Sequence, residues 1–336
     1  MTRLAISVTG ALLGDGIFDP MCSANRDDCL LGYRLLRSAV MKRGGEVHTA
    51  DVWLNQGRRP DAVLFLDIPR DQADMRIFDE GVERWALLQE CEVVMPWNWD
   101  RSRQAPFQKI FTWCDLLVDG KRFFKANFHT PFVRGGGGPD SRANKVVVIA
   151  GNKRADHDAR ELYSSRRVVL ERLDLLQPGC VDLFGQGWER RVFPWRRPWS
   201  RCNSVTMLTN TLVRPPRAYR GPLVSKGPTL SGYKFALCFE NARGMTGYVT
   251  EKIFDAMLAG AVPIYWGAEN IKDLIPESCF IDYRELRSPE ALHDLLLSTD
   301  DGAVRRYQAA IDAFLITPEA RAWSSEGFTD VLAAHL

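Results

Sequence analysis

The residues with the clearest chemical potential lie near position 240, where an apolar run ends in polar side chains. Residues 233–239 read Tyr-Lys-Phe-Ala-Leu-Cys-Phe, which predicts a buried strand, and Glu240 and Asn241 follow directly. In open parallel sheets, ligands bind outside the carboxyl ends of the strands. A carboxylate and an amide at this place can form hydrogen bonds to a polar ligand.

A second polar group follows a glycine-containing loop and opens a predicted helix over residues 251–259. Thr250 is a suitable N-cap, Glu251 and Lys252 fall in the first turn, and Gly260 suits the end of the helix. The free N–H groups of a helix N-terminus and the charge of Lys252 favour an anion. Glu251 would repel a phosphate but can accept hydrogen bonds from sugar hydroxyls. The combination indicates a sugar nucleotide, although both residues also suit an ordinary surface turn.

These groups need a scaffold of alternating strands and helices, and the apolar pattern predicts one. Short apolar runs alternate with segments of helical periodicity, which is typical of parallel βα units with both sheet faces covered. The predicted strands cover residues 4–8, 47–50, 62–67, 145–150, 181–184, 233–239 and 261–266, and the predicted helices cover residues 28–42, 160–176, 251–259 and 286–297. Residues 82–88 and 91–95 are predicted to hold a further helix or strand pair.

The chain is long enough for two domains, and one segment suits the connection between them. Its 336 residues exceed one ordinary core. Residues 134–141 read Arg-Gly-Gly-Gly-Gly-Pro-Asp-Ser, a polar and glycine-rich stretch. We therefore predict an N-terminal domain over residues 1–140 and a C-terminal domain over residues 141–336, whose final helix can pack back on the N-terminal domain.

Composition and charge narrow the class of protein. The formal net charge of +2 argues against nucleic acid as the main partner. No stretch reaches the about 18 to 20 apolar residues that span a bilayer. The eight cysteines form no Cys-x-x-Cys pair, and no Asn-x-Ser/Thr acceptor occurs. We expect a cytoplasmic protein, with peripheral contact at the inner face of a membrane as an option.

The ordered pattern from residue 233 to residue 271 is similar to the signature of glycosyltransferase family 10, the α-1,3/4-fucosyltransferases. It reads Tyr-Lys-Phe-Ala-Leu-Cys-Phe-Glu-Asn-Ala-Arg, then Gly-Tyr-Val-Thr-Glu-Lys-Ile-Phe-Asp-Ala, then Val-Pro-Ile-Tyr-Trp-Gly-Ala-Glu-Asn-Ile. Further similar segments are residues 151–153, 161–167, 184–188 and 275–281. The resemblance covers most of the chain, and the chain resembles the bacterial-type, soluble members of the family.

The resemblance implies a GT-B fold, in which two Rossmann-like α/β domains face a cleft. It implies GDP-L-fucose as the donor, N-acetylglucosamine within a glycan as the acceptor, and inversion to an α-linked product. By match to the family motif, the donor-binding residues are Arg166, Asn241, Tyr248, Glu251 and Lys252. Lys226, in a Gly-x-x-x-x-Lys stretch, is a further candidate and is equally compatible with a surface lysine.

The family places its catalytic base, a glutamate, just after a strand and ahead of a proline-containing loop. Residues 87–96 read Leu-Leu-Gln-Glu-Cys-Glu-Val-Val-Met-Pro here, so two carboxylates compete. Alignment of the preceding apolar run favours Glu90, and spacing back from Pro96 allows Glu92. The base takes the proton of the acceptor hydroxyl. Cations stabilise the departing GDP as charge develops on its β-phosphate.

We expect no required cofactor and no metal site, with a divalent cation at most stimulatory. Asp156-His157-Asp158 has the Asp-x-Asp form that holds manganese in other glycosyltransferases, but Lys153 and Arg154 beside it oppose a cation. Acceptor contacts are expected from residues 19–28 and 97–103, where Trp97 and Trp99 suit either sugar stacking or packing.

Three alternatives remain open at this point. The first is a GT-B transferase with another GDP-sugar donor. The second is a catalytically silent nucleotide- or carbohydrate-binding protein. The third concerns residues 188–220, which combine tryptophans, arginines and prolines. They suit a long surface loop or a contact with an anionic membrane or nucleic acid.

Overall fold

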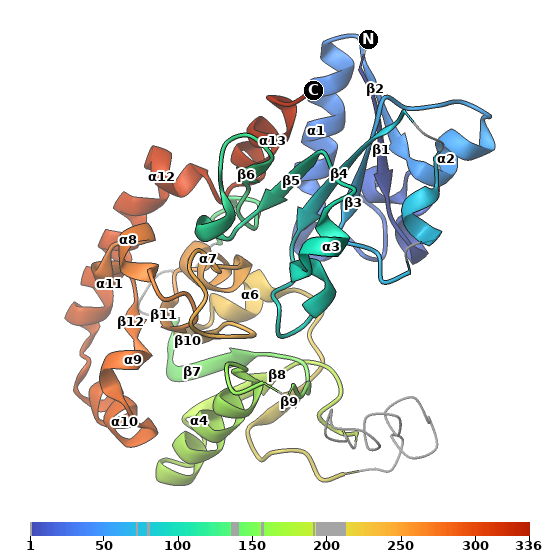
Figure 1. The fold of residues 1–336 in the computed structure, drawn as a ribbon. Coiled ribbons are helices and arrows are strands. Elements are labelled where there is room, and N and C mark those ends of the chain that lie inside the picture. Colours follow the sequence, from blue (N-terminus) through green and yellow to red (C-terminus); the bar gives the residue numbers. More distant parts are fainter. Residues whose placement is uncertain are drawn as a thin grey trace. The chain divides into compact units, whose positions relative to one another are not determined.

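The computed structural model describes residues 2–71, 73–78, 81–135, 141–155, 158–190, 192 and 213–336. The chain divides into two compact units, each built on a six-stranded sheet whose paired strands all run parallel (Figure 1). Unit 1 contains residues 1–132, 246–251 and 318–336, and unit 2 contains residues 133–245 and 252–317. Most of the predicted linker, residues 136–140, lies outside the described residues, as does the predicted boundary at residue 140.

The sheet of unit 1 has the strand order β2-β1-β3-β4-β5-β6. Its strands are β1 (Arg3–Ser7), β2 (Glu46–Thr49), β3 (Ala62–Leu66), β4 (Glu83–Leu88), β5 (Lys109–Thr112) and β6 (Phe123–Lys125). Its helices are α1 (Leu31–Lys42), α2 (Ala50–Asn55), α3 (Arg101–Gln104), α12 (Pro318–Arg321) and α13 (Ser325–Ala333). The order reverses between β1 and β3, and parallel sheets bind ligands at such switch points.

Both faces of this sheet are buried, which explains its nearly continuous apolar strands. On one face, Leu4 and Ile6 of β1 share a core with residues of α1 and with Phe328 and Leu332 of α13. On the other face, Ala5 belongs to a second core around Trp53 of α2. Alternate residues of β1 therefore point into different cores, as the pleat requires.

The sheet of unit 2 has the strand order β12-β11-β10-β7-β8-β9. Its strands are β7 (Ala143–Ile149), β8 (Val181–Phe184), β9 (Tyr219–Gly221), β10 (Tyr233–Phe239), β11 (Val262–Trp266) and β12 (Ile281–Asp282). Its helices are α4 (Tyr163–Leu176), α6 (Lys226–Leu230), α7 (Glu251–Leu258), α8 (Ile271–Leu274), α9 (Tyr283–Leu286), α10 (Pro289–Ser298) and α11 (Asp301–Leu315). Here the order reverses between β7 and β10.

Several predicted boundaries are corrected by the backbone. The helix expected from residue 28 begins at Leu31, because Asp27 and Asp28 have positive φ angles that no α-helix accepts. The helix expected over residues 286–297 begins at Pro289, since Arg287 has a φ of 63° and ends the preceding short helix at Leu286. Residues 91–95 are a turn rather than an element.

No helix among the residues that the structure describes is both long and apolar enough to cross a membrane. The seven cysteines in the described part of the chain are all free thiols.

Candidate active site

The carboxyl end of β10 in unit 2 collects several predicted donor-binding residues. β7 and β10 are neighbours at the switch point of this sheet. Arg166, on α4, is buried, and its guanidinium Nη2 donates to the carbonyl oxygens of Phe239 (2.5 Å) and Glu240 (3.0 Å). Arg166 therefore satisfies two main-chain acceptors at the end of β10.

Lys252, in the first turn of α7, lies against the same strand end. Its Nζ is 3.2 Å from Oε2 of Glu240, and this carboxylate is completely buried whereas the lysine side chain is 24% exposed. Gly267 makes room for the carboxylate, since a Cβ at this position would lie 2.3 Å from Glu240 Cγ. The side chain of Glu240 therefore lies beside Lys252, while the main-chain carbonyl oxygen of Glu240 accepts a hydrogen bond from Arg166.

Asn241 is held at this place by its main chain. Its carbonyl oxygen accepts from the N–H of Leu162 (3.0 Å), just before α4. An isolated antiparallel bridge joins Glu161 and Ala242 next to it. The loop after β10 is thereby tied to the start of α4, and the structure brings Arg166, Asn241 and Lys252 together around Glu240.

Lys226 opens α6 and forms an ion pair of 2.7 Å with Asp255 of α7. Asp255 is one helical turn after Lys252, so Lys226 is tied to the same helix. Its side chain is about one third exposed, at 34%. The structure therefore places Lys226 against α7 through Asp255, and its role in donor binding stays a prediction.

In unit 1, Glu90 is the second residue after β4, at the carboxyl edge of the sheet. Its N–H donates to Asp67 Oδ1 (3.0 Å), and its carbonyl oxygen accepts from Trp99 Nε1 (3.2 Å). The backbone of Glu90 is thus fixed on both sides, and its side chain is half-buried. Glu92 is exposed two residues further along. This surrounding favours Glu90 over Glu92, and the choice of base stays a prediction.

Tyr248 and Glu251 belong to the short segment 246–251, which the contacts assign to unit 1 with Glu90. Tyr248 is completely buried, and its ring packs on Trp113 (centroids 4.6 Å apart) and edge-on to Phe128 (5.9 Å). The backbone also approaches closely, because a Cβ at Gly247, whose φ is +84°, would lie 2.3 Å from the carbonyl oxygen of Trp113.

The predicted acceptor tryptophans are used in packing. The indole of Trp97 donates to the carbonyl oxygen of Ile68 (2.9 Å), and the ring of Trp99 lies 4.9 Å from that of Trp113. Trp188, at the start of the tryptophan- and arginine-rich segment, is buried and donates to the carbonyl oxygen of Ala150 (2.7 Å). Residues 193–212 of that segment lie outside the described residues.

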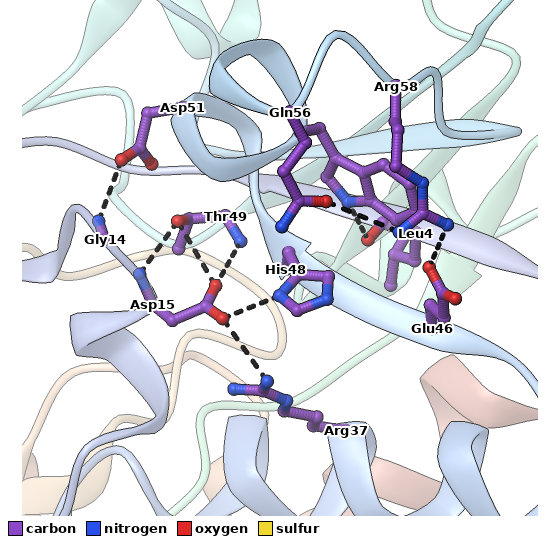
Figure 2. Close-up of polar contacts among 11 residues, drawn as sticks. Leu4, Gly14, Asp15, Arg37, Glu46, His48, Thr49, Asp51, Gln56 and Arg58 are labelled. Carbon is purple, nitrogen blue, oxygen red and sulfur yellow. Dashed lines mark hydrogen bonds and ion pairs between the residues drawn. The ribbon is translucent and has the colours of Figure 1, made fainter.

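The loop after β1 carries a polar cluster that the sequence did not indicate (Figure 2). Asp15 accepts hydrogen bonds from His48 Nδ1 (2.7 Å) and from the N–H of Thr49 (2.8 Å), and its carboxylate lies 3.3 Å from Arg37. Asp51 accepts from the N–H of Gly14 (2.8 Å). These contacts hold the loop against the carboxyl end of β2, and we assign them a structural role.

Metal ligands are not gathered in the described part of the chain, where no group of three histidine, cysteine or acidic side chains is placed to hold an ion. Asp156 and His157, two of the three residues of the Asp-x-Asp candidate, lie outside the described residues. Asp158 accepts from its neighbour Arg160 (2.7 Å).

Three residues important to this arrangement were not singled out as site residues from the sequence. Glu240 is predicted only as a polar strand end, Asp67 only as the last residue of a predicted strand, and Asn98 only as part of the expected acceptor segment 97–103. The signal for Glu240 and Asp67 is the same, an acidic residue directly after a buried strand. Asn98 carries no such signal, because its partners are far away in sequence.

A family model described as "Glycosyltransferase family 10 (fucosyltransferase) C-term" matches residues 220–322. Among curated proteins, the chain is 48% identical over 65 residues to an alpha-(1,3)-fucosyltransferase of Helicobacter pylori, covering 19% of this chain and 13% of that protein. It is 40% identical over 82 residues to an alpha-(1,4)-fucosyltransferase of Arabidopsis thaliana, covering 24% and 20%. The matched segments thus span a fifth or less of the length of these relatives.

Among solved structures, an alpha1,3-fucosyltransferase superposes with a TM-score of 0.56 at 15% identity, covering 98% of this chain and 89% of that one. An alpha1,3-fucosyltransferase with GDP-fucose gives a TM-score of 0.54 at 15% identity, covering 99% of this chain and 91% of that one. An alpha-glucosyltransferase bound to UDP-glucose and DNA gives 0.58 at 11% identity, covering 98% and 97%. At these identities the likeness concerns the fold, and the predicted GT-B fold is confirmed.

Proposed function

From the glycosyltransferase family 10 domain that the chain carries at residues 220–322, we propose that this protein transfers L-fucose from GDP-L-fucose to a glycan. The proposed acceptor is O3 of N-acetylglucosamine, as in N-acetyllactosamine, and the proposed product is an α-1,3 linkage formed with inversion. The enzyme would act in protein glycosylation or polysaccharide biosynthesis.

The observation that carries the proposal is the gathering of Arg166, Asn241 and Lys252 at the carboxyl end of β10. Two cationic side chains and the N-terminus of α7 suit a diphosphate, and an amide suits hydroxyl groups. The position is the switch point of a parallel sheet, where nucleotides bind in such folds. No metal is needed in this scheme, because Arg166 and Lys252 would carry the charge of the leaving group.

The proposed mechanism is a single displacement. Glu90 takes the proton of the acceptor hydroxyl, the acceptor oxygen attacks the anomeric carbon of fucose, and the bond to the β-phosphate of GDP breaks. Arg166 and Lys252 stabilise the negative charge that forms on this phosphate. Each such group contributes about 2 to 4 kcal/mol, judged by comparable oxyanion sites.

Thermal unfolding with nucleotides tests the donor. GDP or GDP-fucose at about 100 times its dissociation constant should add about 2.7 kcal/mol of stability. UDP-galactose should add none, and GDP-mannose separates a fucose-specific site from a general GDP-sugar site. Incubation of the protein with GDP-fucose and N-acetyllactosamine, followed by linkage analysis of the product, then tests the transfer. Stabilisation by the uridine nucleotide alone would refute the proposed donor.

A further inference from the structure

The loop that carries Glu90 is tied to the end of the neighbouring strand β3 through one carboxylate. Asp67, the residue after β3, accepts three hydrogen bonds at a single oxygen, Oδ1. The donors are the N–H of Gln89 (2.7 Å), the N–H of Glu90 (3.0 Å) and Nδ2 of Asn98 (2.6 Å). The first two residues after β4 are therefore bound to a residue of another strand.

Asn98 completes this connection from the far end of the loop. Its side chain is fully buried, and its Oδ1 accepts from the N–H of Ile68 (2.8 Å) while its Nδ2 also reaches the carbonyl oxygen of Glu90 (3.3 Å). Both main-chain groups of Glu90 thus contact this pair of side chains. A main chain held by buried hydrogen bonds on both sides has little freedom to move.

The backbone of Asp67 indicates that this arrangement has a cost in stability. Its φ of 62° is in the left-handed region, which non-glycine residues seldom adopt. Burial also raises the pKa of its carboxyl group, although the three donors oppose that rise. A strained backbone and a buried carboxyl group at one residue are typical of functional sites, where stability is given up for a required geometry.

From this geometry we propose that Asp67 and Asn98 are positioning residues that hold Glu90 in place for proton abstraction. The inference rests on the proposed function, because it takes Glu90 as the base. It does not require Asp67 to touch either substrate. The acceptor hydroxyl must be aligned with both the base and the anomeric carbon, and a misplacement of about 1 Å can cost on the order of 100-fold in rate.

The test compares Asp67→Ala, Asp67→Asn and Asn98→Ala in the full chain, with GDP-fucose and N-acetyllactosamine as substrates. Asp67→Ala should lower kcat by about 10- to 100-fold, with the KM for GDP-fucose little changed, since the two residues proposed to bind the diphosphate, Arg166 and Lys252, belong to unit 2. Asp67→Asn should stay within about fivefold of wild type, because an amide oxygen can accept the same bonds and asparagine tolerates a positive φ.

Asp119 offers a matched control within the same unit. Its carboxylate also accepts from three N–H groups, those of Lys121, Arg122 and Phe123, each at 2.8 Å. It lies at the amino-terminal end of β6, away from the edge that carries Glu90. Asp119→Ala should therefore leave kcat unchanged even if the melting temperature falls.

Amide hydrogen exchange of residues 88–99 provides a readout that does not depend on the acceptor. Protection of the Gln89 and Glu90 amides should be lost in Asp67→Ala, retained in Asp67→Asn and unchanged in Asp119→Ala. Full kcat in Asp67→Ala, or lost kcat with unchanged protection, would overturn the positioning role. If the wild-type protein transfers no fucose, the proposed function fails. In that case hydrogen exchange still tests the positioning role, because unchanged protection of Gln89 and Glu90 in Asp67→Ala would show that Asp67 does not hold the backbone of Glu90.

Discussion

Lys252 and Glu240 form an ion pair of 3.2 Å in which the carboxylate is completely buried and the ammonium is partly exposed. The two partners therefore have different relations to solvent. Glu240 depends on its surroundings for compensation of its charge, whereas Lys252 keeps a path to solvent and to a ligand. Removing the lysine should affect both folding and binding, and these two effects can be separated.

Lys252→Ala should lower the free energy of unfolding by about 2 kcal/mol, because it takes an ion-pair partner from a buried carboxylate. It should also abolish the stabilisation by GDP. The double variant Lys252→Ala with Glu240→Gln should regain much of the stability but not the response to GDP. Thermal melts with and without GDP measure both effects. A GDP response in the double variant equal to wild type would show that Lys252 does not bind the nucleotide.

Glu90→Gln should reduce kcat by about 100- to 10,000-fold, because glutamine cannot accept the proton of the acceptor hydroxyl. Glu92→Gln, the control two residues away, should leave kcat within a few-fold of wild type, since this side chain is exposed. Steady-state transfer to N-acetyllactosamine decides between them. The reverse pattern would assign the base to Glu92.

Removal of divalent cations tests whether cationic side chains are sufficient at the donor site. Dialysis against a chelator, followed by assay in its presence, should leave more than half of the transfer activity, with Arg166 and Lys252 carrying the charge of the leaving group. Complete loss that is restored by manganese would contradict this expectation. It would also direct attention to Asp156-His157-Asp158.

The stability of unit 1 should depend on His129 in mildly acidic solution. Burial lowers the pKa of His129 to about 4 from 6.5, and its ring stacks on Phe328 of α13 with centroids 4.1 Å apart. Because the unfolded chain binds a proton near pH 6.5 and the folded chain does not, stability should fall as the pH drops from 6.5 towards 4. The contribution of this one group is at most about 3 kcal/mol.

The measurement is the free energy of unfolding in urea between pH 7 and pH 5 for the wild type and His129→Phe. Phenylalanine keeps an aromatic ring against Phe328 but does not titrate. The variant should therefore show a shallower decline than the wild type. Parallel curves for the two proteins would mean that other groups cause the acid sensitivity.

The sequence allowed prediction of those parts of the fold in which local pattern and burial agree. The strand over residues 233–239 and the helix from residue 251 are as predicted, because each has a clear apolar period and polar residues at its ends. β5 and β6 were missed as strands. They are short, and their limits depend on ladder partners rather than on composition.

The candidate site likewise contains residues that a local sequence pattern predicts and residues that it does not. Asn241 and Lys252 could be named because they fall within the long family-like pattern, and Arg166 because it falls within the family-like segment 161–167. The three residues do gather at one strand end. The Asp67–Asn98 contact could not be found in this way, since the two residues are 31 positions apart and their contact depends on the register of β3 against β4. Long-range polar contacts of this kind follow from the assembled sheet and not from local spacing.

Helix α13 has a consequence for how this protein is made. Phe328 and Leu332 share a core with Leu4 of β1, although almost the whole chain separates them in sequence. At about 5 to 20 residues per second, translation reaches residues 325–333 roughly 10 to 40 s after residue 132. During that interval the nascent sheet of unit 1 exposes part of its apolar face. The chain should therefore bind chaperones during synthesis, and its yield should fall when they are limiting.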